Sequence, residues 1–103
     1  MQLEIDVATG AQSTVIRLAG ELDGSVAERV RQYIEPYLTR GRSVIADLSG
    51  LSFADSTGLS VLVQCHNAAR AVGSRFWVEN ARGEVAMVLE LTCLTDLLSK
   101  PPY

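Results

Sequence analysis

The sequence has few of the residues that build metal sites, disulfide frameworks and nucleophilic active sites. Its 103 residues include one histidine, His66, and two cysteines, Cys65 and Cys93. Two distant thiols in apolar stretches form neither a disulfide framework nor a metal site, so we expect buried, reduced cysteines. Because the acidic residues also lack metal-ligand spacing, we expect neither a metal nor a cofactor.

Also missing are a surplus of basic residues, a long apolar run and a leader-like N-terminus. Nine basic residues against twelve acidic ones give a net charge of -3, and no basic patch of the kind found in nucleic-acid-binding proteins is visible. No apolar run approaches the ~18 residues of a membrane span. Residues 1–6 alternate between apolar and polar, unlike a signal peptide. We therefore expect a cytoplasmic protein that binds no nucleic acid directly and does not insert into a membrane.

The apolar content is sufficient for one hydrophobic core. The chain is 48% hydrophobic and 20% charged, which suits a single domain over residues 1–103 that folds without metals or disulfides. We find no internal repeat, low-complexity segment or linker in the sequence.

The first quarter of the chain predicts a β-hairpin. Apolar residues alternate with acidic ones over residues 3–7, which is the period of a half-exposed strand. Residues 9–12 have the composition of a turn, and residues 13–19 form a second apolar run that can pair with the first. The segment Gly-Glu-Leu-Asp-Gly at residues 20–24 then breaks the strand pattern.

The next segment predicts a helix and a buried strand. Ser25 and Glu28 match a capping box, and apolar residues at helical spacing follow them. Pro36 should end or kink this helix near its last turn. The apolar run at residues 44–48 is typical of a central strand that is buried on both faces.

A tight turn should join this strand to a second helix. Gly73 should end that helix as a C-cap. The apolar residues that recur along one face of it are Leu59, Leu62, Cys65, Ala69 and Val72.

The remainder of the chain predicts a strand in the middle of the sheet at residues 75–78 and a helix at residues 84–91. Residues 94–98 form a short final element, either a strand or a helical turn. The order is therefore ββαβαβα with a tail. Strands alternating with helices indicate an α/β fold, a mixed central sheet of about four to five strands with helices packed on it.

The most specific segment is Asp-Ser-Thr-Gly-Leu at residues 55–59, where the second helix should begin. The free N–H groups and partial positive charge of a helix start tolerate an added phosphate. Capping accounts for Asp55 or Ser56 but not for both. Gly58 costs up to ~1 kcal/mol of helix propensity and would let a partner or a neighbouring strand approach the backbone. An exposed Ser56 hydroxyl there favours a binding domain that phosphorylation switches.

A catalytic interpretation of Ser56 lacks a base. His66 follows ten residues later, which corresponds to about 15 Å along a helix. The chain also lacks a Gly-x-Ser-x-Gly elbow and a glycine-rich phosphate loop. We therefore predict that the protein is not an enzyme. Glu21 and Asp23 either end the preceding strand as turn residues, or Asp23 lies near the helix start, where its charge would matter to a partner.

Three segments at this spacing resemble the STAS domain of bacterial anti-sigma factor antagonists. They are Gly-Glu-Leu-Asp at residues 20–23, Asp-Leu-Ser at residues 47–49 and Asp-Ser-Thr-Gly-Leu at residues 55–59. The resemblance covers nearly the whole chain, including its length and element order. It implies the STAS fold and a role in transcription regulation. At residues 92–94 the sequence departs from the family, which often has a glycine where Cys93 stands.

The resemblance implies a partner-switching function. Members of the family bind an anti-sigma factor, often a serine kinase, and so release a sigma factor. The kinase phosphorylates the serine that matches Ser56, which ends the binding, and a PP2C-type phosphatase removes the phosphate. Thr57 stands where some relatives have a second serine. Carried over to this chain, the partner-binding surface comprises Asp23, Asp55, Ser56, Thr57 and Gly58.

Two other functions are open. A STAS subunit that is never phosphorylated would be a scaffold in a stressosome-like assembly or an accessory subunit of a lipid-transporting ABC complex, with Ser56 as a helix cap. A small-ligand or nucleotide-binding module is disfavoured, because no phosphate-cradling loop is visible. The sequence leaves room for a weak homodimer and does not determine the oligomeric state.

Overall fold

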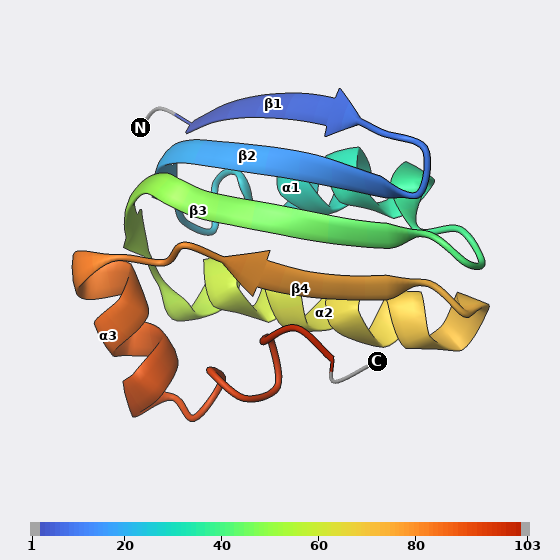
Figure 1. Cartoon of the computed structure of the whole chain (residues 1–103). Helices are drawn as coiled ribbons and strands as arrows, with labels where there is room; N and C mark the ends of the chain where they lie inside the picture. The colour runs from blue at the N-terminus through green and yellow to red at the C-terminus, as the bar shows by residue number, and fades with distance from the viewer. Residues whose placement is uncertain (1–2, 102–103) are drawn as a thin grey trace.

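The computed structural model describes residues 3–101 and has the predicted order of strands and helices (Figure 1). No helix between residues 3 and 101 is both long enough and apolar enough to cross a bilayer. The elements are β1 (Leu3–Thr9), β2 (Ser13–Leu22), α1 (Ala27–Ile34), the 3-10 helix η1 (Glu35–Tyr37), β3 (Ser43–Ala54), α2 (Ser56–Val72), β4 (Arg75–Glu79) and α3 (Gly83–Leu91).

The four strands form one mixed sheet in the order β1-β2-β3-β4. The predicted hairpin is confirmed, because β1 pairs antiparallel with β2, while β2–β3 and β3–β4 are parallel. The prediction that residues 75–78 lie in the middle of the sheet was wrong, since β4 is an edge strand. Its outer edge is covered by the tail, where the Leu98 carbonyl accepts the Val78 N–H at 2.8 Å. The tail itself makes a helical turn from Leu94 to Leu98 and no strand.

The core lies between the sheet and the helices α1 and α2, which lie side by side on one face of it (Figure 1). Alternate residues of β2 and β3 point into this core, and the residues between them point away. Burial raises the pKa of the Cys65 thiol in α2 to about 12. The sheet contributes Ile16, Leu18, Val44, Ala46, Leu48 and Phe76, and the helices contribute Val30, Ile34, Leu59, Leu62 and Cys65.

Strands β2 and β3 are longer than predicted. The expected breaks after Ala19 and after Leu48 are replaced by paired strand that continues to Leu22 and Ala54. The pairing contains two register shifts, which are β-bulges. A Cβ on Gly50 would lie 2.9 Å from the Ala19 Cβ. Gly50 therefore allows the two strands to approach closely at a bulge.

The predicted capping box at the start of α1 was wrong. The helix begins at Ala27, and its N-cap, Val26, makes no side-chain cap hydrogen bond. Ser25 instead donates its hydroxyl and its N–H to the Asp23 carboxylate, at 2.5 Å and 2.9 Å. The Ser25 side chain therefore binds the Asp23 carboxylate and not the free N–H groups of the helix. Short polar side chains near a helix start often form such local hydrogen bonds instead of a cap. Pro36 does end the helix as predicted, inside η1.

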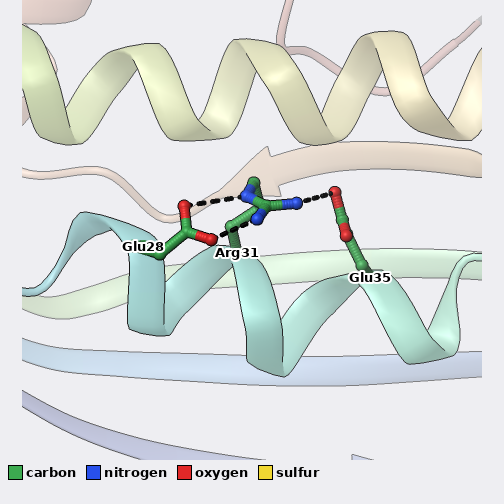
Figure 2. A network of polar contacts seen from close by, with 3 residues as sticks. All are labelled: Glu28, Arg31 and Glu35. Atoms are coloured by element: carbon green, nitrogen blue, oxygen red, sulfur yellow. Dashed lines mark hydrogen bonds and ion pairs between the residues drawn. The ribbon is translucent and has the colours of Figure 1, made fainter.

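The exposed face of α1 carries an ion-pair network. Figure 2 shows Arg31 between Glu28 and Glu35, one turn away on each side. The Arg31 guanidinium donates to Glu28 and, at 2.7 Å, to Glu35. Both hydrogen bonds raise the pKa of Arg31, and the hydrogen bond between Arg31 and Glu28 lowers the pKa of Glu28. Glu28 thus serves this network and not a capping box.

Helices α2 and α3 end with the same backbone geometry. A residue in the left-handed region follows each helix, Gly73 at φ 77° and Cys93 at φ 60°. The next amide then donates five residues back, as Leu94 N–H does to the Leu89 carbonyl at 2.9 Å, which is a Schellman motif. Cys93, where the family often has a glycine, therefore keeps the left-handed turn that a glycine would adopt more easily. Cys93 is exposed, against our expectation, and so is Val72, which was predicted to face the core.

These two turns predict opposite effects of substitution. Cys93→Gly should raise the free energy of unfolding by about 0.5–1 kcal/mol, because a side chain in the left-handed region is strained. Gly73→Ala should lower it by about 1 kcal/mol or more, since its Cβ would also lie 3.3 Å from the Arg40 Cγ. Urea unfolding of both variants measures these changes. A loss of stability in Cys93→Gly would contradict the assignment of strain.

Candidate functional site

Of the two residues that the sequence offered as the cap of α2, Asp55 and Ser56, the structure selects Asp55. Its backbone is extended, and its Oδ1 accepts the Gly58 N–H at 2.8 Å. The cap satisfies one of the free N–H groups at the helix start. Ser56 and Thr57 follow as the first helical residues, and both are exposed. The structure therefore presents two hydroxyl groups at the positive end of a helix of 17 residues.

Gly58 is required by the neighbouring strand. A Cβ at this position would lie 2.3 Å from the carbonyl oxygen of Leu22 and 2.7 Å from its Cγ. The same carbonyl accepts the Asp55 N–H at 3.2 Å. Of the two explanations for this glycine, close approach by a neighbouring strand is confirmed. Gly58 is buried, so it shapes the site from below.

Asp23 lies beside the start of α2 because it directly follows Leu22. The next residue, Gly24, faces Thr57, since a Cβ on it would lie 3.5 Å from the Thr57 Cγ2. The Asp23 carboxylate accepts two hydrogen bonds from Ser25, and the one from the hydroxyl is the main cause that lowers its pKa. The structure thus brings together the predicted site residues of two segments, 20–24 and 55–58.

The third segment of the resemblance, Asp-Leu-Ser at residues 47–49, supports the strand and not the site surface. The Asp47 Oδ1 accepts the Ser49 N–H at 2.9 Å and an Asn80 amide N–H at 3.3 Å. The Ser49 N–H is the main cause that lowers the pKa of Asp47. The Asp47 carboxylate therefore accepts a backbone N–H, that of Ser49, at the point where the bulge interrupts the hydrogen bonds between β2 and β3.

The site has no catalytic constellation. Within residues 3–101, no group of three or more His, Cys, Asp or Glu residues could hold a metal ion. The Asp55 carboxylate is engaged by the Gly58 N–H. His66 lies on the same helix as Ser56, ten residues later, which is about 15 Å away along the axis. The arrangement suits Ser56 as the target of another protein's chemistry.

Sequence reasoning missed an apolar groove that begins at Ser56. The groove has a volume of about 410 Å³ and runs between α2 and the residues that follow α3. Helix α3 also exposes Met87 by 53% and Leu91 by 75%. The sequence did contain a signal for this apolar surface. Helix α3 has more apolar residues than are needed to cover one buried face. The lining includes Ser56, Leu59, Val63, Thr92 and Leu94.

The STAS domain family model matches residues 2–102 of this sequence. The fold and the capped helix start described above agree with that match. The chain therefore belongs to the STAS domain family.

Two relatives of this chain are anti-sigma factor antagonists. The chain is 26% identical over 98 residues to the anti-sigma-B factor antagonist of Bacillus subtilis, covering 95% of this chain and 90% of that protein. It is 30% identical over 96 residues to the anti-sigma F factor antagonist of Lysinibacillus sphaericus, covering 91% and 81%.

The solved structures include the anti-sigma factor antagonist SpoIIAA in two forms. The unphosphorylated form is 27% identical with a TM-score of 0.77, over 90% of this chain and 84% of that one. The phosphorylated form, from Bacillus, is 26% identical with a TM-score of 0.69, over 90% and 86%. The fold of the chain is thus that of an anti-sigma factor antagonist.

The contact beneath the site predicts the effect of a single methyl group. Gly58→Ala should lower the free energy of unfolding by about 3 kcal/mol, because its Cβ would overlap the Leu22 carbonyl and the backbone would have to move. Gly24→Ala is the matched control and should change stability by no more than about 0.5 kcal/mol, since its Cβ has room. Urea unfolding measures both. Equal stability of the two variants would show that Gly58 is not held against β2.

Proposed function

We propose that this protein is an anti-sigma factor antagonist that phosphorylation of Ser56 switches off. In its unphosphorylated form it binds an anti-sigma factor that is also a serine kinase, and a sigma factor is released. The observation that supports this most is the exposed Ser56 hydroxyl at a capped helix start beside an apolar groove. The similarity to anti-sigma factor antagonists over most of the chain supports it independently.

The partner would cover the start of α2 and the groove beside it. The half-buried Val63 and Leu94 offer apolar contact area, and the hydroxyls and carboxylates around them form a polar rim. This combination of an apolar centre and a polar rim is typical of protein interfaces. Asp23 lies in the loop between β2 and α1, and Asp55 lies at the start of α2. Their negative charges favour basic groups on the partner.

The physical effect of a phosphate on Ser56 would differ between fold and interface. A phosphate adds about -1.5 to -2 charge, which the start of a helix stabilises. The same charge would lie next to Asp55 and near Asp23, whose carboxylates repel it. It would also occupy a surface that is complementary to a bare hydroxyl. Phosphorylation should therefore leave the domain folded and prevent binding. The exposed position would also admit a PP2C-type phosphatase, which restores the hydroxyl.

The first test is binding to the partner kinase. Wild type and Ser56→Ala should retain from extracts of the source cells an anti-sigma factor with a histidine-kinase-like ATPase fold, identified by mass spectrometry. Ser56→Asp should bind it at least about tenfold more weakly, because one misplaced interface charge costs a few kcal/mol. Thr39→Asp adds the same charge in the exposed loop after η1 and should bind normally. Identical partners for all variants, with Ser56 never modified, would favour the scaffold or transporter-subunit function.

The second test separates loss of binding from loss of folding. Ser56→Asp and the phosphorylated protein should differ from wild type by no more than ~1 kcal/mol in free energy of unfolding, because the helix dipole offsets the repulsion by Asp55. Thermal and urea unfolding measure this difference. A large fall in stability would mean that phosphorylation acts by disrupting the fold.

A further inference from the structure

The end of the molecule opposite Ser56 is rich in arginine. Three connections meet there: the β1–β2 turn, the loop before β3 and the turn from α2 to β4 (Figure 1). Backbone hydrogen bonds hold them together, from Ser43 N–H to the Gln12 carbonyl at 3.1 Å and from Gly41 N–H to the Gly73 carbonyl at 3.0 Å. We call this region the arginine end, and its arginines are Arg40, Arg42, Arg70 and Arg75.

The segments that form the arginine end contain no acidic residue. Neither Asp nor Glu occurs in residues 10–16, 36–46 or 56–78. Asp23 and Asp55 lie at the other end of the molecule. The net charge of -3 therefore conceals a positive potential at the arginine end, which attracts anions.

A cavity of about 360 Å³ opens at the arginine end, between α2, the start of β4 and the tail. Its volume is in the range of small-molecule sites, about 300–1,000 Å³. Its wall is mostly apolar, and no carboxylate lines it among residues 3–101. The lining residues are His66, Arg70, Ser74, Arg75, Phe76 and Pro101.

Two arginines, Arg70 and Arg75, and one histidine, His66, are among the polar residues that line this cavity. Arg70 is exposed and forms no ion pair with any residue from 3 to 101. His66 is half-buried and lies one helical turn before it, on the same face of α2. A guanidinium binds carboxylate, sulfonate or phosphate through paired hydrogen bonds. An apolar wall beside such a donor is complementary to a molecule that is apolar at one end and anionic at the other.

We propose that this cavity binds a small organic anion, with its apolar body against Phe76 and Pro101 and its anionic head at Arg70 and His66. The volume of about 360 Å³ holds about a dozen water-sized groups of ~30 Å³. The body is therefore a group of about ten non-hydrogen atoms, such as two fused aromatic rings. The proposal goes beyond the phosphorylation switch, because the cavity lies toward the other end of α2 and needs no partner protein.

Titration with 1-naphthoate tests the proposal, with 1-naphthamide as a neutral ligand of the same shape. Amide NMR spectra of the labelled protein should show shifts concentrated in residues 66–76. The dissociation constant of 1-naphthoate should be at least about tenfold lower than that of 1-naphthamide, because only the carboxylate pairs with a guanidinium. Binding of neither probe, equal affinity for both, or shifts centred on residues 56–64 would overturn the proposal.

A matched pair of variants assigns the anionic head to Arg70. Arg70→Gln should weaken 1-naphthoate binding about tenfold and leave 1-naphthamide binding unchanged. Arg82→Gln makes the same change of charge at an exposed residue before α3 and should leave both affinities unchanged. An equal effect of the two variants would contradict the site. Neither variant alters Ser56 or its surroundings, so this outcome is independent of the binding tests of the switch.

Discussion

The close contact between the end of β2 and the start of α2 is the constraint on which the site depends. The Leu22 carbonyl accepts the Asp55 N–H and occupies the space that a Gly58 side chain would need. Parallel strands end at the same edge of a sheet, so β2 delivers Asp23 to the point where β3 leads into α2. The cap, the exposed hydroxyls and the neighbouring carboxylate all follow from this arrangement.

Charge divides the molecule along α2. Asp23 and Asp55 lie at the end that carries Ser56, and the arginine end lies at the opposite end of the parallel strands. A phosphate on Ser56 would therefore meet two opposing influences, a helix start that favours it and carboxylates that repel it. We expect the folded domain to tolerate that conflict more easily than an interface would, because an interface must also exclude water from the modified surface.

Two of the errors in predicting the fold came from glycine and serine. Gly50 lies in a segment that was expected to be a turn, but it permits close pairing of β2 and β3 at a bulge. Ser25 suggested a helix cap, but its hydroxyl binds Asp23. In each case the local pattern was compatible with two structures, and a contact within or between segments selected one. The long periodic segments were predicted correctly because their burial pattern admits a single period.

The sequence by itself determined the order of strands and helices, a helix cap at either Asp55 or Ser56, and the place of Ser56 at the start of α2. Each of these depends on residues within a few positions of one another. Only the tertiary structure decided that β4 is an edge strand, that Gly58 faces Leu22, and that a groove and a cavity flank α2. These features arise where segments far apart in the chain pack together, and local periodicity carries no information about which segments will meet.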